Sequence, residues 1–249
     1  MIRERIATWR IEAGIHKNLR NGRCDLRQNR SPLLLTKVNT EFPDRPKLLA
    51  DPKALEARLK QTHDSHIAPL THFVDNLRAD RGPDAAIPYF DPWDGGVEAE
   101  LLLLLEAPGP KALRTGFVSR DNPDETAKNL FEATNMAGLE RQRTVIWNVV
   151  PWYIGNGKTI RQANTADINQ GARDLRDLIE LLPELRAVVM LGKKAQRAET
   201  LLKEMLPALA LFECPHPSPM FVNRAPENWE ILLNRLRNVG HFLKSSARW

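Results

Sequence analysis

Five consecutive leucines, Leu101 to Leu105, stand between the acidic residues Glu98, Glu100 and Glu106. The run is far too short to cross a bilayer, which takes about 20 apolar residues. A short, unbroken apolar run is typical of a strand that is buried on both faces, as in a parallel sheet covered by helices. The leucine run therefore predicts a sheet at the centre of the fold.

The chain on both sides of this run alternates between strand-like and helical patterns. Strand-like segments are expected at 143–150, 185–191 and 208–213. Helical patterns cover 66–79, 124–137, 165–182, 193–205 and 226–239. Such alternation favours an α/β fold with three layers, α/β/α, around a central parallel sheet.

Two helix starts can be placed by their capping residues. Asp51 is expected to cap a helix that has Pro52 in its first turn, and Thr165 is expected to cap the helix over 165–182. The stretch 81–96 is rich in Pro, Gly and Asp and is read as a loop.

Positive charge is concentrated at the N-terminal end. Residues 1–65 hold 14 Lys or Arg against 8 Asp or Glu, whereas the remainder holds 22 against 23. Residues 1–48 lack sustained periodicity and are interpreted as a basic extension, followed by a single domain over 49–249. A basic extension suits contact with a polyanion, although a solvated arm without a partner fits the charge equally well.

Two cysteines, Cys24 and Cys214, are too few for a disulfide framework or a four-thiolate metal site. The first residues, Met-Ile-Arg-Glu-Arg-Ile, contain no apolar core of signal-peptide length. We therefore expect a cytoplasmic monomer that contacts no membrane and needs no metal or cofactor.

Three chemically distinctive segments follow predicted strands. They are Glu106-Ala-Pro-Gly, Asn148-Val-Val-Pro-Trp and His216-Pro-Ser-Pro. In open parallel sheets, ligands bind outside the carboxyl ends of the strands. These three segments are therefore expected to meet in one cleft.

In order and spacing, these segments resemble the motifs of the uracil-DNA glycosylase superfamily over roughly residues 85–240. The resemblance implies an enzyme that removes a damaged base from DNA. Its implied catalytic residues are Glu106 and His216. The implied base-binding residues are Ala107, Pro108, Gly109, Phe117 and Asn148.

The chemistry of base removal needs these residue types. Phe117 offers a flat apolar surface for stacking, and the amide of Asn148 reads the hydrogen-bonding edge of a base with a donor and an acceptor. His216 can donate to the negative charge that grows on the leaving base. Glu106 can stabilise an oxocarbenium-like sugar and position water.

The residues after His216 suggest DNA contacts. Met220 and Phe221 are apolar for a loop, as expected of a wedge that enters the base stack. Pro217, Ser218 and Pro219 are expected to form a stiff loop that grips phosphate.

Departures from the motifs leave the preferred base open. The first motif opens with Leu105 instead of glycine, and Gly109 stands where the best-known branch carries a tyrosine that excludes thymine. Hypoxanthine or xanthine therefore stand beside uracil as candidate substrates. A nucleic-acid-binding protein with this fold but little or no catalysis is the main alternative. An unrelated α/β hydrolase is weaker, since the chain has no Gly-x-Ser-x-Gly elbow.

Overall fold

The computed structural model describes residues 42–82, 85–156 and 160–245. The chain divides into two units, Met1–Pro43 and Asp44–Trp249. The predicted basic extension lies outside the described residues up to position 41. The boundary at residue 48 stays a prediction. Leu49 donates its backbone N–H to Asp121, and Lys47 pairs with Glu125, so both residues contact the rest of the larger unit.

A four-stranded parallel sheet forms the centre of the larger unit, as the leucine run predicts. The strand order is β4-β2-β5-β6. In register, Leu105 of β2 lies beside Asn148 of β4, and Leu191 of β5 lies beside Cys214 of β6, so the carboxyl ends of all four strands meet at one edge. The strands are β2 (Leu101–Leu105), β4 (Thr144–Asn148), β5 (Ala187–Leu191) and β6 (Ala210–Cys214).

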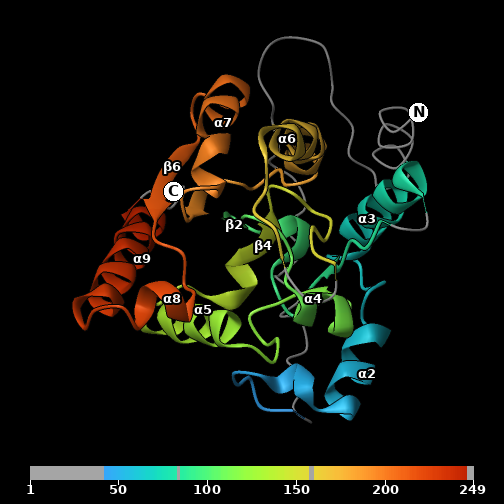
Figure 1. Cartoon of the computed structure of the whole chain (residues 1–249), viewed down its shortest axis with the longest axis horizontal. Coiled ribbons are helices and arrows are strands. Elements are labelled where there is room, and N and C mark those ends of the chain that lie inside the picture. Colours follow the sequence, from blue (N-terminus) through green and yellow to red (C-terminus); the bar gives the residue numbers. More distant parts are fainter. Residues whose placement is uncertain (1–41, 83–84, 157–159, 246–249) are drawn as a thin grey trace, which may run out of the picture. The chain divides into compact units, whose positions relative to one another are not determined.

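Burial does not follow the position of a strand in the sheet alone, because the edge strand β4 is buried along its whole length. The first four leucines of β2 and all of β5 are 0% exposed because both strands have neighbours on each side and helices over their faces. The edge strand β6 is only half-buried. Helices flank the sheet (Figure 1), with α9 contacting β5, β6 and α5, and with α3 contacting α6. The α/β prediction is confirmed.

The helices largely follow the predicted ranges. The predicted helix over 193–205 is divided into a 3-10 turn, η4, and α7. The last helix runs six residues beyond its predicted end at Val239. The bounds are α2 (Pro52–Lys60), α3 (Ala68–Arg81), α5 (Glu125–Met136), α6 (Thr165–Glu180), η4 (Ala195–Ala198), α7 (Glu199–Met205), α8 (Pro219–Val222) and α9 (Glu227–Ser245).

The helix caps give one confirmation and one correction. Asp51 caps α2 as predicted, accepting the Lys53 N–H at 2.9 Å. Helix α6, however, is capped by Asn164 and not by Thr165. The Asn164 side chain accepts the Asp167 N–H at 2.9 Å, and Asp167 accepts the Asn164 N–H at 2.8 Å. Because both bonds of this capping box involve Asn164, the cap lies one residue before the predicted Thr165.

A second, two-stranded parallel sheet was not predicted. It pairs β1 (Tyr89–Phe90) with β3 (Phe117–Val118). Between the leucine strand and β3 lies a short helix, α4 (Pro110–Thr115), which ends at Gly116 with φ 79°. Strands of two residues and a helix of six are too short to produce a periodic pattern, so the sequence does not predict them.

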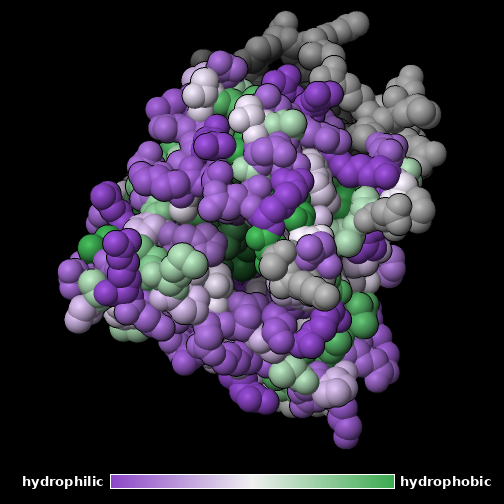
Figure 2. Space-filling model, viewed as in Figure 1, coloured by the Kyte–Doolittle hydropathy of each residue, from purple (hydrophilic) through white to green (hydrophobic). Residues whose placement is uncertain are grey.

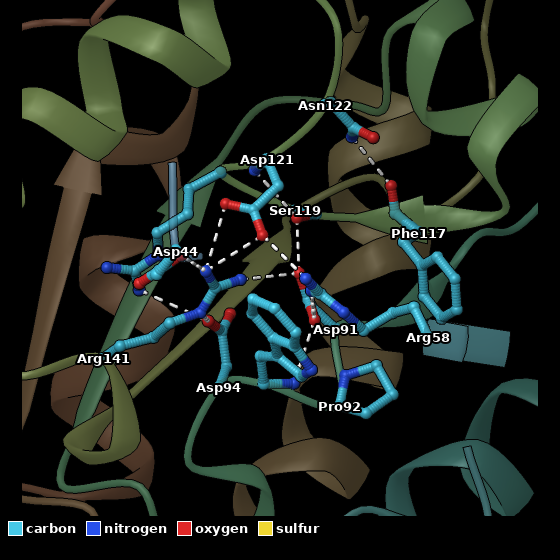
Figure 3. Close-up of polar contacts among 12 residues, drawn as sticks. Asp44, Arg58, Asp91, Pro92, Asp94, Phe117, Ser119, Asp121, Asn122 and Arg141 are labelled. Carbon is cyan, nitrogen blue, oxygen red and sulfur yellow. Dashed lines mark hydrogen bonds and ion pairs between the residues drawn. The ribbon is translucent and has the colours of Figure 1, made fainter. Parts of the chain in front are cut away.

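Beside this small sheet lies a buried network of charges (Figure 3). Arg58 of α2 donates to Asp121 at 2.9 Å, and Arg141 donates to Asp91 at 2.8 Å and to Asp94 at 3.0 Å. Arg120 and Asp44 complete the network, which contains three arginines and four aspartates. Ion pairs this deeply buried are costly to break, at about 3–5 kcal/mol when one partner is removed.

Ser119 joins this buried network of charges to the wall of a cavity. The Ser119 hydroxyl donates to Asp91 and accepts the Asp121 N–H at 2.9 Å (Figure 3). Ser119 itself faces the cavity that is described below. Among the described residues, no helix is long and apolar enough to cross a membrane.

Candidate functional site

A cavity of about 520 Å³ lies at the carboxyl ends of β2 and β4, which is a size typical of ligand pockets. Figure 2 shows a recess near the centre of this face with hydrophobic surface at its floor. Glu106 after β2, Asn148 at the end of β4 and His216 after β6 all line it. The structure thus brings three segments that are far apart in sequence to one site.

Glu106 is half-buried and is held by the extension of the sheet. The carbonyls of Leu105 and Glu106 accept the N–H groups of Val149 and Val150 at 2.8 and 2.9 Å. The side-chain Oε1 accepts the backbone N–H of Ala163 at 2.8 Å. No donor from the described residues contacts Oε2, so this oxygen is available to water or a ligand.

Asn148 is positioned by the alternation of side chains along β4. Ile146 and Asn148 line the cavity, whereas Trp147 points to the opposite face and stacks on Phe90 with ring centroids 4.1 Å apart. Asn148 is only 3% exposed, and its Nδ2 has no hydrogen-bond partner among the described residues. A buried donor without a partner costs about 1–3 kcal/mol, so this amide is prepared for an acceptor that a ligand brings.

His216 is neutral in this environment. Burial lowers its pKa, and the charge of Glu106 opposes that shift only in part. The Ser218 N–H donates to Nδ1 at 3.2 Å. Since Nδ1 accepts, the ring proton of the neutral side chain is on Nε2, which becomes the one donor that the ring offers to a ligand.

Close packing at Gly192 supports the ring of His216. A Cβ at position 192 would lie 3.0 Å from the Cβ of His216, and Gly192 has φ 93°, a conformation that favours glycine. The end of β5 and the histidine loop can therefore lie against each other.

The loop after His216 is held by side-chain amides from two helices. Asn129 of α5 donates to the carbonyl of Pro217 at 2.8 Å, and Asn228 of α9 donates to that of Phe221 at 2.7 Å. Within this frame, Ser218 precedes the short helix α8, and Met220 is 86% exposed. Met220 and Phe221, which are expected in a loop, thus lie in this short helix, and the methionine is presented to solvent from it.

The first motif contributes one wall of the cavity. Ala107, Pro108 and Gly109 line it, and Gly109 leads into α4. A Cβ placed on Gly109 would have no atom within 4 Å. This wall therefore leaves room that a larger residue would occupy.

Phe117 does not reach the cavity, which corrects the expected stacking role. Its side chain is 0% exposed and is absent from the residues that line the cavity, whereas its neighbour Val118 lines it. The reason is the alternation of β3, where consecutive side chains point to opposite faces. Pairing with Tyr89 fixes this register.

Sequence reasoning also missed part of the cavity wall. Some of these residues come from α4, α5 and the turn after β3, and others from the segment before α6. No motif marks them, since only the fold brings them to the cavity. They are Lys111, Ser119, Asn122, Asp124, Thr126, Ile154, Ile160, Arg161 and Gln162.

Trp152 and Cys214 do not line the cavity. The guanidinium of Arg81 lies over the Trp152 ring at 4.7 Å from its centroid, and Trp152 is not among the residues that line the cavity. Cys214 is a buried free thiol whose pKa burial raises to about 12, so it is unreactive. Within the described ranges, no group of three or more His, Cys, Asp or Glu side chains could hold a metal ion.

Comparison with known proteins gave one family match and several structural similarities. The family model of the uracil DNA glycosylase superfamily matches residues 92–237. No curated protein matched in sequence.

Two solved structures are similar to the chain. A Methanosarcina acetivorans protein, a candidate uracil DNA glycosylase studied by NMR in solution, is 20% identical with a TM-score of 0.42, over 58% of this chain and 92% of that one. Wild-type SMUG2 of Pedobacter heparinus is 13% identical with a TM-score of 0.48, over 74% of this chain and 87% of that one.

Proposed function

The chain belongs to the uracil DNA glycosylase superfamily, and from this membership we propose that it is a monofunctional DNA glycosylase. It would hydrolyse the N-glycosidic bond of uracil or another deaminated base in DNA. The observation that carries the proposal is the shared cavity, where the free Nδ2 of Asn148 and the neutral ring of His216 stand with Glu106.

Entry of the base requires the nucleotide to leave the base stack, at a cost of a few kcal/mol. The apolar part of the cavity, which includes Pro108, Val118 and Ile146, would receive the base by contact with its faces. Asn148 would then read the edge of the base. Its Nδ2 donates to a base carbonyl, and its side-chain carbonyl accepts a ring N–H.

Departure of the base leaves negative charge on it. The neutral His216 would donate from Nε2 to a base oxygen as this charge grows. Burial keeps the ring of His216 uncharged before the reaction begins, so the donor is a neutral imidazole. Removing one such donor from an active site costs about 10²–10³ in rate.

Glu106 would act on the sugar and on water. As the bond from the sugar C1′ to the base nitrogen breaks, its electron pair goes to the base and the sugar becomes cation-like. The Glu106 carboxylate stabilises this cation, and its free Oε2 orients a water molecule, whose oxygen bonds to C1′. The proton that the water loses goes to the carboxylate and finally to the departed base.

DNA would be gripped by the loop over 217–221. Pro217, Ser218 and Pro219 would contact the phosphates beside the flipped nucleotide. Met220, which is 86% exposed, and Phe221 would fill the gap in the base stack. The amide bonds of Asn129 and Asn228 to this loop would keep the wedge in position.

The test is excision from labelled oligonucleotides, single- and double-stranded, each with one uracil, hypoxanthine or xanthine, followed by alkaline cleavage of abasic sites. Glu106→Ala and His216→Ala proteins are compared with Glu204→Ala and His241→Ala, which change exposed residues of α7 and α9. A large fall in the excision rate in the first pair alone supports the proposal. DNA binding without cleavage of any substrate would instead favour a binding protein with this fold.

A further inference from the structure

The segment before α6 is tied to Glu106 by its backbone. The N–H of Ala163 donates to Oε1 of Glu106 at 2.8 Å, and Ala163 is 1% exposed. A peptide group therefore sets the direction of this carboxylate. Whatever orients Ala163 also decides how Oε2 faces the cavity.

On the α6 side, this segment is anchored by Asp167. Arg161 makes two bonds to the Asp167 carboxylate, at 2.5 and 2.9 Å, and the capping box joins Asn164 to the same residue. These bonds fix the neighbours of Ala163. The N–H of Asn164 shares a planar peptide group with the carbonyl of Ala163, so its bond to Asp167 also orients that carbonyl. The N–H of Ala163 belongs to the preceding peptide group, and rotation about the backbone bonds of Ala163 can turn it away from Glu106.

On the sheet side, the contact to Ala163 comes from Lys194. This lysine follows β5, which is the neighbour of β2 in the sheet. Its Nζ donates to the carbonyl of Ala163 at 3.1 Å, and its side chain is half-buried. Ala163 is thus held at both polar atoms, with its N–H on Glu106 and its carbonyl on Lys194.

We propose that Lys194 is a positioning residue for Glu106, which it orients through the backbone of Ala163. The proposal rests on the role of Glu106 in the proposed function. A misplaced reacting group costs on the order of 100-fold in rate for a shift of about 1 Å. Lys194→Met keeps the length of the side chain but removes the donor, so it should lower the excision rate by about 10- to 100-fold.

A double-mutant cycle tests the route through Glu106. Single-turnover excision and DNA affinity are measured for Lys194→Met, for Glu106→Ala and for the combination. Lys194→Met should lower the rate constant alone, and it should cost nothing further once Glu106 is alanine. The matched control is Lys193→Met, which removes the same charge from an exposed neighbour and should keep the rate constant. Additive losses, or an equal loss in the control, would overturn the proposal.

A second measurement does not depend on activity. In the full chain, Glu106→Gln should shift the backbone amide resonance of Ala163, because the hydrogen bond to a carboxylate is replaced by a weaker one. The same change should have little effect in the Lys194→Met background and should regain its effect with Lys194→Arg. An undiminished response in Lys194→Met would refute the positioning role, even if the protein excised no base and the proposed function itself had failed.

Discussion

The backbone N–H of Ser218 donates to Nδ1 of His216 at 3.2 Å, so a peptide bond within the His-Pro-Ser-Pro motif fixes the tautomer of its own histidine. The spacing of two residues makes this bond local. The motif by itself therefore determines which ring nitrogen of His216 carries the proton, and the fold only has to bring Nε2 to the cavity. Burial then keeps the ring neutral by lowering its pKa.

This arrangement predicts how His216 titrates. Its pKa should lie below the ordinary histidine value of about 6.5, as measured by NMR titration of its ring resonances. Because the pKa of His216 is lower in the folded state, the unfolded chain binds this proton at a higher pH than the folded protein does. The contribution of the histidine to stability is therefore lost as the pH falls below about 6.5. Excision should decline as the pH falls through the lowered pKa of His216 in the folded protein. A pKa above about 6.5 for His216 would contradict the neutral role.

Asn148→Asp should change base choice. The substitution removes the Nδ2 donor and leaves acceptors only, which lose the bond to a base carbonyl and repel it. We expect the excision rate on uracil to fall by about 10²-fold or more, as for the loss of other positioned donors. Rates are compared on each lesion, with Asn238→Asp, at an exposed residue of α9, as an amide control outside the cavity. Equal rates for parent and Asn148→Asp on every lesion would show that Asn148 does not read the base.

Gly109→Tyr should narrow the range of bases. No atom lies within 4 Å of a Cβ added at Gly109, so a side chain can leave the backbone there without a clash and extend into the cavity that Gly109 lines. Excision of the larger bases hypoxanthine and xanthine should fall more than excision of uracil. The ratio of the rates on hypoxanthine and uracil is the measurement. An unchanged ratio would show that this wall does not limit substrate size.

The buried Asp94 should make stability depend on pH. Burial raises its pKa to about 7, against the attraction of Arg120 and Arg141, while Asp91 and Asp121 add to the rise. A raised pKa in the folded state contributes stability at low pH, which is lost as the pH rises through 7. In urea denaturation, the free energy of unfolding of the parent relative to Asp94→Asn should fall between pH 5 and pH 8. A constant difference would show that Asp94 stays charged.

Removal of residues 1–41 should weaken DNA binding and flatten its salt dependence. These residues hold 9 Lys or Arg against 4 Asp or Glu. Each phosphate contact that is lost reduces the slope of log affinity against log salt by about 0.9 for duplex DNA. The slope is measured with the full chain and with a chain that begins at residue 42. Identical slopes would show that the basic segment makes no phosphate contact.

Much of the fold could be predicted from the sequence alone. The leucines of β2 and the apolar residues of β5 had to be buried on both faces, which required a parallel sheet with helices over it. That sheet placed Glu106, Asn148 and His216 at one edge, because parallel strands all end on the same side. Local chemistry also predicted the Asp51 cap.

The tertiary structure decided those features of the site that depend on contacts between residues far apart in the sequence. Phe117 has the expected motif spacing, but the pairing of β3 with β1 directs its ring into the core. As a result, the neighbouring residue Val118 lines the cavity instead. The link from Lys194 through Ala163 to Glu106 joins three segments that no local pattern connects. Sequence periodicity reports which face of an element is buried, whereas the choice of contacts at a strand end depends on the register and packing of the whole sheet.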